Sequence, residues 1–255
     1  MMQTYPPRTE EEVKAETTVW WDINRCPVPG DVNPRLIGPF IKDSLKNIGY
    51  SGRLTITAIG ILTEVDNEVL QALCSTGVSL YHIPTEGVVR PLCRLLNDYP
   101  PPANLMVLSR QGFLDQFIRS LSSTYNILGS IYPERSIRYG FARSEECYLW
   151  ETFLADIRSP TTVREPLLPE AGQWRTMAGP ALFCGSCKLD LKGFQSFANH
   201  LCSKEHALKD LHYQPFGGAR AAFESKGLDA DAIRGMLKRL REAPRQPLYD
   251  EDDED

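Results

Sequence analysis

Short apolar runs alternate with stretches of helical periodicity over the first 157 residues. Five runs rich in β-branched and aromatic residues read as strands, at 17–23, 53–62, 78–83, 105–108 and 125–131. The intervals have helical spacing, and the expected helices cover 34–48, 66–73, 87–98, 113–121 and 145–155. Continuous apolar strands separated by helices are typical of a parallel sheet covered on both faces. Residues 17–157 are therefore predicted to form one α/β domain.

The periodic pattern ends after this domain. Residues 158–180 are rich in Pro, Thr and Gly and are predicted to be a linker. Residues 213–249 are predicted to be a basic helical extension, in which apolar positions of 228–242 line one side and Arg and Lys surround them. This helix could bind RNA or a protein partner, or it could pack back on the preceding segment. The polar N-terminus, residues 1–16, is predicted to be disordered.

Two cysteines and two histidines have the spacing of a metal site. Cys184, Cys187, His200 and His206 follow the pattern C-x2-C-x12-H-x5-H. Zn²⁺ is bound in structural sites by four such ligands in a tetrahedron. Residues 181–212 are therefore predicted to be a two-Cys, two-His zinc finger with a structural Zn²⁺ ion.

The residues between the ligands predict how this finger is built. Phe183 and Phe194 are expected to form a miniature core, and one helix is expected to carry both histidines. The finger resembles the matrin-like, double-stranded-RNA-binding group, whose long His–His gap often holds Ser-Lys-x-His, as 203–206 does here. The resemblance implies recognition of nucleic-acid shape and phosphates. The phosphate contacts would be Lys188, Lys192, Lys204 and Lys209, which could equally be ordinary solvated surface.

The charge of the chain is unevenly distributed. The whole sequence has a net charge of −5, but residues 172–249 carry 12 Lys and Arg against 7 Asp and Glu. A basic segment of this kind suits a polyanionic partner such as RNA. The last six residues, 250–255, are all acidic and are predicted to be a disordered tail. The tail could compete with nucleic acid for the finger, contact a protein partner, or simply keep the chain soluble.

Composition and cysteine usage bear on the compartment. A chain of 255 residues with 42% hydrophobic content can bury one sizeable core and a small satellite domain. No apolar stretch reaches the roughly 18 residues that would span a membrane, and the polar, acidic start predicts no secretory signal. The last residues match neither a peroxisomal nor an endoplasmic-reticulum address. The five cysteines outside the zinc pattern are expected to be free thiols in a reducing compartment, cytoplasm or nucleus: Cys26, Cys74, Cys93, Cys147 and Cys202.

In open α/β sheets, ligands gather at the carboxyl ends of the strands, where Asp22 follows the first run. The surrounding WWDINRCPVP (20–29), with 54–62 and 75–84, resembles the NYN domain, a branch of the PIN-like metal-dependent ribonucleases. The closest likeness is to the limkain-type group, named for meiosis regulator and mRNA stability factor, and to its plant relatives. The resemblance extends from about residue 17 to 131. The NYN resemblance implies a PIN-like parallel sheet of about five strands and activity on RNA. A peroxisomal association is implied only by the resemblance to the limkain-type group.

The chemistry of this family needs several carboxylates around Mg²⁺ or Mn²⁺. By the resemblance, Asp22 matches the first family carboxylate and Asn24 the residue that helps to position it. The acidic pair expected before the third helix is replaced by Gly-Val-Val at 87–89, and the acidic run after the fourth strand by Ser-Arg-Gln-Gly-Phe at 109–113. The nuclease site is therefore predicted to be weakened or lost. Substitutes, each of which could instead be a helix cap or a solvated charge, are Glu64, Asp66, Glu86 and Asp115.

Three functions follow from these patterns. The first is an RNA-binding regulator of mRNA stability and gene expression, built on a degenerate NYN domain and an RNA-binding finger. The second is an active metal-dependent endoribonuclease that uses the finger to hold its substrate. The third is a zinc-containing adaptor for protein partners. Fold cannot separate the first two, and the carboxylates around Asp22 are the feature that distinguishes them.

Overall fold

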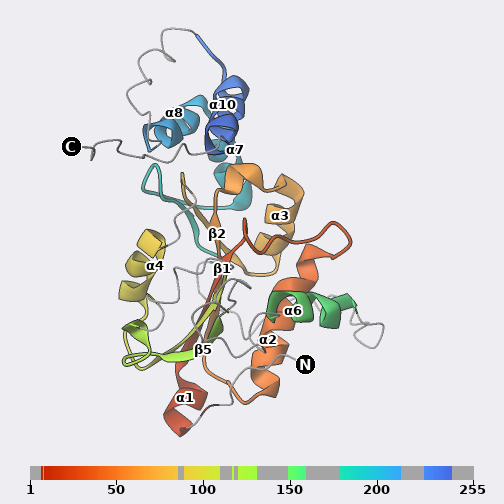
Figure 1. The fold of residues 1–255 in the computed structure, drawn as a ribbon, viewed down its shortest axis with the longest axis vertical. Helices are drawn as coiled ribbons and strands as arrows, with labels where there is room; N and C mark the ends of the chain where they lie inside the picture. Colours follow the sequence, from red (N-terminus) through yellow and green to blue (C-terminus); the bar gives the residue numbers. More distant parts are fainter. Residues whose placement is uncertain are drawn as a thin grey trace, which may run out of the picture.

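The computed structural model describes residues 7, 9–85, 89–109, 117, 120–130, 149–158, 179–213 and 227–242, and its fold is drawn in Figure 1. The strands are β1 (Glu16–Asp22), β2 (Leu54–Gly60), β3 (Ser79–His82), β4 (Ala103–Leu108), β5 (Asn126–Ser130), β6 (Leu182–Cys184) and β7 (Leu189–Leu191). The α-helices are α1 (Glu10–Lys14), α2 (Ile37–Asn47), α3 (Asn67–Ser75), α4 (Val89–Leu95), α6 (Leu149–Arg158), α7 (Phe194–Cys202), α8 (Lys204–His212) and α10 (Ala230–Glu242). Short 3-10 helices are η1 (Pro34–Leu36), η2 (Leu62–Glu64) and η3 (Leu96–Asp98).

The chain has the predicted α/β fold with a mainly parallel sheet. The seven strands lie in the order β5-β4-β1-β2-β3-β6-β7, and every neighbouring pair is parallel except β6 and β7. Each of the five strands expected from the apolar runs is present, with ends shifted by no more than two residues. Because β1 lies inside the sheet between β2 and β4, its carboxyl end is flanked by theirs.

Alternating side chains of the strands divide the core between the two faces of the sheet. Val19, Trp21 and Ile23 belong to the larger core, whereas Trp20 lies in a smaller core on the opposite face. Helices α2, α3 and α6 cover the larger core and α4 covers the other face, as Figure 1 shows. Because its alternating side chains point to two covered faces, β1 is buried almost throughout.

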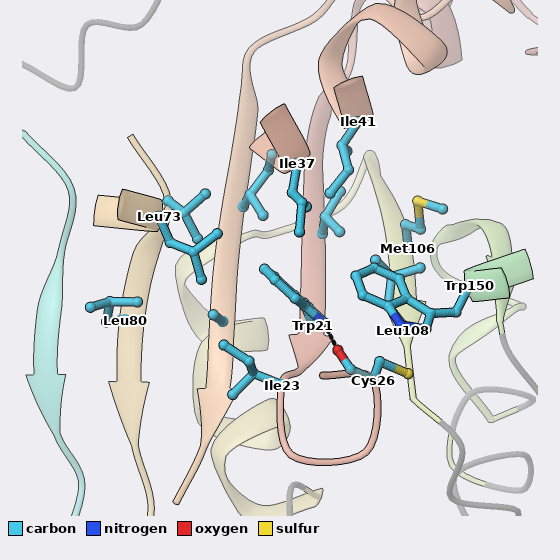
Figure 2. Packing of buried hydrophobic residues seen from close by; sticks show 14 of the residues in the cluster. Trp21, Ile23, Cys26, Ile37, Ile41, Leu73, Leu80, Met106, Leu108 and Trp150 are labelled. Atoms are coloured by element: carbon cyan, nitrogen blue, oxygen red, sulfur yellow. Dashed lines mark hydrogen bonds between the residues drawn. The ribbon is translucent and has the colours of Figure 1, made fainter. Parts of the chain in front are cut away.

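In the larger core, side chains of the covering helices pack against Trp21 of β1 and Trp150 of α6 (Figure 2). Trp21 lies 5.2 Å from Trp150, measured between ring centroids, and its Nε1 donates a hydrogen bond to the Cys26 carbonyl oxygen at 2.8 Å. This bond satisfies a buried indole N–H and fixes the segment that follows β1. Figure 2 shows the neighbours that surround them, among them Ile37, Ile41, Leu73, Leu80, Met106 and Leu108.

Turn and capping residues end these elements largely as expected. Asn33 caps η1, which leads directly into α2, and Asp66 caps α3 by accepting a hydrogen bond from the Glu68 amide at 2.9 Å. Gly49 and Gly77 follow α2 and α3 with φ values of 109° and 89°, a conformation that favours glycine at helix ends. The predicted helices at 87–98 and 145–155 correspond to α4 with η3 and to α6.

The predicted finger is part of the sheet and not a separate small domain. Its strand β6 pairs in parallel with β3, so that Cys184 lies opposite His82, and β7 then extends the edge. The sheet consequently has seven strands where about five were expected. This pairing could not be predicted, because it joins segments about a hundred residues apart and a backbone hydrogen-bonding partner leaves no local pattern in the sequence.

The miniature core predicted for the finger is also wrong. Phe183 packs with Tyr81 in the smaller core, at 4.8 Å between ring centroids, whereas Phe194 and Phe197 pack into the larger core on the opposite face. Phe183 lies on β6 and points to one face of the sheet, whereas Phe194 and Phe197 lie on α7, which contacts α3 and η2. The segment of residues 181–212, called here the finger unit, therefore buries its aromatic residues against the sheet.

Two helices, and not the single one expected, carry the histidines of the finger unit. Helix α7 ends at Cys202, and Ser203 caps α8 by accepting a hydrogen bond from the His206 amide at 3.1 Å. Ser203 has extended backbone angles, which interrupt the helix within the five-residue gap between the histidines. A serine in this position was visible in the sequence, but its capping role was not recognised.

The basic C-terminal helix packs back on the finger unit. Ile233 and Leu237 of α10 are buried against Ala207 and Leu211 of α8. Figure 1 places α7, α8 and α10 together at the end of the sheet opposite to α1. Of the two alternatives left open by the sequence, the structure therefore shows packing on the finger, while the outer basic residues of α10 remain exposed or half-buried.

The N-terminal segment contains more structure than predicted. Residues 10–14 form α1, which Thr9 caps through a hydrogen bond from the Glu12 amide at 3.1 Å. The chain then enters β1 at Glu16, so the disorder expected for all of 1–16 is wrong for residues 10–16. The predicted helix at 113–121, most of the predicted linker and the acidic tail lie outside the described residues. No helix in the described parts of the chain is long and apolar enough to cross a membrane.

Candidate metal centre and the carboxyl edge of the sheet

The structure brings the four predicted metal ligands together. Cys184 ends β6, Cys187 follows in the turn before β7, His200 lies on α7 and His206 on α8. One ligand atom from each residue lies within 4.8 Å of the others. The group is mostly buried and lies next to the carboxyl end of β3, because Cys184 is the neighbour of His82 across the sheet.

The turn between the two cysteines is fixed by the sheet beside it. The Gly185 amide donates a hydrogen bond to the His82 carbonyl oxygen at 2.8 Å, and a Cβ added at Gly185 would lie only 2.8 Å from that same oxygen. Lys188 adopts a φ of 55°, which closes the turn after Cys187. The Cys187 amide also points at the Cys184 Sγ atom, at 3.4 Å. Both thiols are thereby directed to the same side of the turn.

The distances between ligand atoms fit a tetrahedral zinc site. The Nδ1 atom of His206 lies 3.5 Å from Cys184 Sγ and 3.6 Å from Cys187 Sγ. Zinc bonds of about 2.3 Å to sulfur and about 2.0–2.1 Å to nitrogen, set at a tetrahedral angle, place sulfur and nitrogen about 3.6 Å apart. The Nε2 atom of His200 is buried without a hydrogen-bond partner among the described residues, which is costly unless an ion fills that position.

The protonation of these groups in the metal-free protein follows from their burial. Burial raises the pKa of Cys184 to about 12, and it also raises the pKa of Cys187. Burial lowers the pKa of His206 to about 4 and lowers that of His200 as well. The imidazoles are therefore neutral with a lone pair ready for a metal ion, whereas the thiols must each lose a proton when they bind one. The four residues could hold a metal ion, and their chemistry and spacing suit Zn²⁺.

Three polar residues beside this centre were not predicted. Asp210 accepts hydrogen bonds from Ser186 Oγ at 2.5 Å and from His82 Nε2 at 3.1 Å, and its Oδ2 lies 3.5 Å from His206 Nε2. Burial tends to raise the pKa of Asp210, but the partners His82, His206 and Ser186 outweigh it, so that the pKa lies below its ordinary value. Two features of the sequence are consistent with this arrangement: Asp210 follows His206 by one helical turn, and His82 is the last polar residue of the third apolar run.

At the centre of the same sheet edge, Asp22 is buried at the carboxyl end of β1. It accepts hydrogen bonds from Ser109 Oγ at 2.8 Å and from the Arg25 amide at 3.3 Å. Desolvation raises the pKa of Asp22, and these hydrogen bonds together with the nearby Arg25 charge only partly oppose it.

The Asn24 side chain is engaged by the backbone of the neighbouring strand. Its Oδ1 accepts a hydrogen bond from the Ile61 amide at 2.6 Å, and its Nδ2 donates to the Ile61 carbonyl at 3.4 Å. Gly60 makes this approach possible, because a Cβ there would lie 2.2 Å from Asn24 Oδ1. Asn24 thus connects the segment after β1 to the end of β2.

The substitute carboxylates do not gather around Asp22 within the described residues. Glu64 forms an ion pair with Arg241 of α10, and Asp66 caps α3. Glu86 and Asp115 lie outside the described residues. In the parts of the chain that the structure describes, no group of three or more acidic, His or Cys residues suited to a metal includes Asp22.

The four finger lysines are exposed or half-buried, and Lys192 follows the end of β7 that lies away from Cys184. Lys188, Lys192 and Lys209 are exposed and Lys204 is half-buried. Lys188 follows Cys187 directly, and Lys209 lies one turn beyond His206 on α8. The described cysteines outside the metal centre form no disulfide, namely Cys26, Cys74, Cys93 and Cys202, and Cys147 lies outside the described residues.

Comparison with known families identifies the domain that contains Asp22. Residues 16–137 match the family model of the NYN domain, a little under half of the chain. The match begins at the first residue of β1 and extends beyond β5, which confirms the NYN resemblance seen in the sequence. No curated protein matches the chain.

Proposed function

We propose that this protein is an RNA-binding regulator of mRNA stability or gene expression that retains an NYN fold without its nuclease chemistry. NYN domains act on RNA, and residues 16–137 match that domain. We further assign the chain to the limkain-type group, on the strength of the WWDINRCPVP motif at 20–29. The observation that carries the proposal comes from the described residues: Asp22 accepts hydrogen bonds from a hydroxyl and a backbone amide, and it belongs to no cluster of carboxylates there.

The chemical argument concerns charge. Metal-assisted cleavage of a phosphodiester requires a site that concentrates negative charge to hold Mg²⁺ or Mn²⁺. Around Asp22, burial favours the neutral acid, Asn24 is occupied by Ile61, and Glu64 is neutralised by Arg241. A site built in this way stabilises the sheet edge and has little affinity for a divalent cation.

The finger unit supplies the second half of the proposal. Its Cys and His residues would hold a structural Zn²⁺ ion, which would join β6, α7 and α8 at one point. Lys188 and Lys209 are exposed beside the ligand residues, and Lys192 is exposed after the end of β7 that lies away from Cys184. The three form no ion pair within the described residues, so they are available to phosphates. The unit continues the carboxyl edge of the NYN sheet, and one RNA could contact both.

An active endoribonuclease is the second candidate. Asp22 favours it, because this carboxylate lies buried at the carboxyl end of β1, an interior strand, where ligands of such sheets bind. Glu86 and Asp115 would then have to approach Asp22 from the residues that are not described. A protein adaptor remains the third candidate, and it requires that substitution of the basic finger lysines has no effect on RNA binding.

Single-turnover cleavage of a labelled structured RNA tests the first two candidates. The zinc-loaded protein is incubated with Mg²⁺ or Mn²⁺ beside the Asp22→Asn variant, and binding of the same RNA is measured by fluorescence anisotropy. We expect RNA that is bound and intact in both proteins. Metal-dependent cleavage that disappears in Asp22→Asn would overturn the proposal in favour of the nuclease.

Paired lysine substitutions test the role of the finger in binding. Lys188→Gln with Lys192→Gln should weaken RNA binding and lower the slope of log Kd against log salt concentration by about 2, one for each lost phosphate contact. Lys42→Gln with Lys46→Gln on α2 removes the same charge from another part of the surface and is the matched control. Equal, small effects of both pairs would exclude the finger as an RNA contact, and protein partners would then be the better explanation.

A further inference from the structure

The two nitrogens of the His206 ring face different groups. Nδ1 points to the two thiols, at 3.5 and 3.6 Å, while Nε2 lies 3.5 Å from the Asp210 carboxylate. A neutral imidazole has one lone pair for a metal ion and one N–H to donate. In this arrangement the lone pair belongs at Nδ1 and the proton at Nε2.

From this geometry we propose that His206 binds zinc through Nδ1, and that Asp210 and His82 form the outer support that orients it. Asp210 is a positioning residue that touches no metal ion itself. Its Oδ2 faces the buried His206 Nε2 at 3.5 Å, an ion-pair distance without a hydrogen bond, so the Nε2–H left by metal binding at Nδ1 is turned toward this oxygen. His82 belongs to β3 of the NYN domain, so the support reaches from the sheet into the finger unit. The inference rests on the proposed zinc site and is independent of RNA binding.

The tautomer of His82 is fixed by the backbone. The Leu62 amide donates a hydrogen bond to His82 Nδ1 at 3.1 Å, so the proton of a neutral His82 ring lies on Nε2, which faces both oxygens of Asp210 at 3.1 Å. Binding a metal ion through Nε2 would leave this ring with no proton at all. His82, His206 and Asp210 are close enough to suggest a second metal site, but the Leu62 hydrogen bond makes His82 a donor to Asp210 and not a ligand.

Burial makes this support stiff. The His82, His206 and Asp210 side chains are at most 2% exposed, and Ser186 Oγ donates to the other oxygen of Asp210. Removing such a carboxylate from a ligand histidine commonly lowers metal affinity by about 10–100-fold, because the ring loses both its orientation and part of its basicity. Because Asp210 also bridges strand β3 and helix α8, zinc binding and the position of the sheet edge are linked through it.

The support continues toward the centre of the carboxyl edge. Leu62, which holds His82, follows Ile61, whose amide is held by Asn24. Loss of the zinc ion should therefore loosen the connection between β2 and α3, in addition to the finger unit. Hydrogen exchange of the Leu62 amide reports this directly: protection in the zinc-loaded protein should fall after chelation, and unchanged protection would contradict the link.

Nuclear magnetic resonance of the wild-type protein tests the mode of binding. In ¹⁵N-labelled, zinc-loaded protein, long-range proton–nitrogen correlations of the histidine rings show which nitrogen carries hydrogen and which carries metal. We expect metal at Nδ1 and hydrogen at Nε2 for His206, and metal at Nε2 for His200. Metal at Nε2 of His206 would overturn the inference. A wild-type protein that retains no zinc would remove the proposed metal site itself, which the zinc content measured beforehand reveals.

Zinc affinity tests the role of Asp210. Competition with a chromophoric chelator should show that Asp210→Asn binds zinc about 10–100-fold more weakly than the wild type. Asp190→Asn, an exposed change in β7 of the same hairpin, should leave the affinity unchanged. If Asp210→Asn does not fold, Ser186→Ala, which removes a single donor to the carboxylate, should show a smaller loss. Wild-type affinity in either of these two folded variants would show that the carboxylate does not position the ligand.

Discussion

Phe197 offers a test of whether the finger unit and the NYN sheet are one cooperative structure. This side chain is fully buried and comes from α7, yet it belongs to the larger core beneath α2, α3 and α6. In an independent zinc finger, its loss would affect the finger alone. Here Phe197→Ala opens a cavity in the main core of the sheet, so the destabilisation should be shared by the whole described fold.

The expected magnitude follows from this burial. Truncating a fully buried phenylalanine to alanine costs about 3–5 kcal/mol of unfolding free energy. With an m value of about 2 kcal/mol/M in urea, the midpoint should fall by about 2 M. Tryptophan emission reports the sheet, since Trp20, Trp21 and Trp150 are buried in it. A weak zinc indicator reports the finger in the same titration at fixed total zinc, because bound metal contributes to stability.

Both signals should move together in Phe197→Ala. Leu189→Ala, at an exposed position of β7 in the same unit, is the control and should change the unfolding free energy by no more than about 0.5 kcal/mol. If zinc is released at lower urea concentration in Phe197→Ala while the tryptophan transition stays in place, the finger unit unfolds by itself and the reasoning is refuted.

Three further predictions concern the metal, a close backbone contact and a buried acid. Zinc binding should release two protons between about pH 6 and 8, because burial raises the pKa of Cys184 to about 12, raises that of Cys187 as well, and so keeps both thiols protonated in the metal-free protein. Calorimetry in buffers of different ionisation enthalpy counts the released protons, and fewer than one would contradict the prediction. Gly60→Ala places a Cβ 2.2 Å from Asn24 Oδ1 and should lower the unfolding free energy by about 1–3 kcal/mol, whereas Gly235→Ala, in open space on α10, should raise it by up to about 1 kcal/mol. Thermal unfolding compares the two variants, and equal shifts would argue against the close contact. Because desolvation raises the pKa of Asp22 in the folded state, the wild type loses stability as the pH rises through that pKa. The stability of Asp22→Asn relative to the wild type should therefore increase from about pH 4 to about pH 8. Urea unfolding across this range tests the trend, and a difference that stays constant or decreases would show that burial does not dominate the pKa of Asp22.

Much of the secondary structure could be predicted because it depends on local patterns. Apolar runs such as 17–23 and 53–62 became buried parallel strands, and Asn33 and Asp66 cap the helices that follow. The metal ligands were equally visible, since the spacing from Cys184 to His206 reflects the stereochemistry of one ion. In each case the information lies in residues close together in the chain.

The arrangement of the finger unit could not be predicted in the same way. Phe183 and Phe194 were expected to pack against each other because they are neighbours in sequence, but each packs against a different face of the sheet. His82 and Asp210 are 128 residues apart and meet only because β6 pairs with β3. Such contacts depend on strand order and register, which a single sequence does not encode in any local pattern.

The sequence by itself determined the α/β class, the likeness to NYN domains and the set of four metal ligands, because periodicity and ligand spacing are local properties. Tertiary structure alone decided that the finger completes the sheet, that Asn24 holds Ile61, and that Glu64 pairs with Arg241. The physical reason is that the role of a polar side chain depends on which donor or acceptor folding places within about 3 Å of it, and for these residues that partner comes from a distant part of the chain.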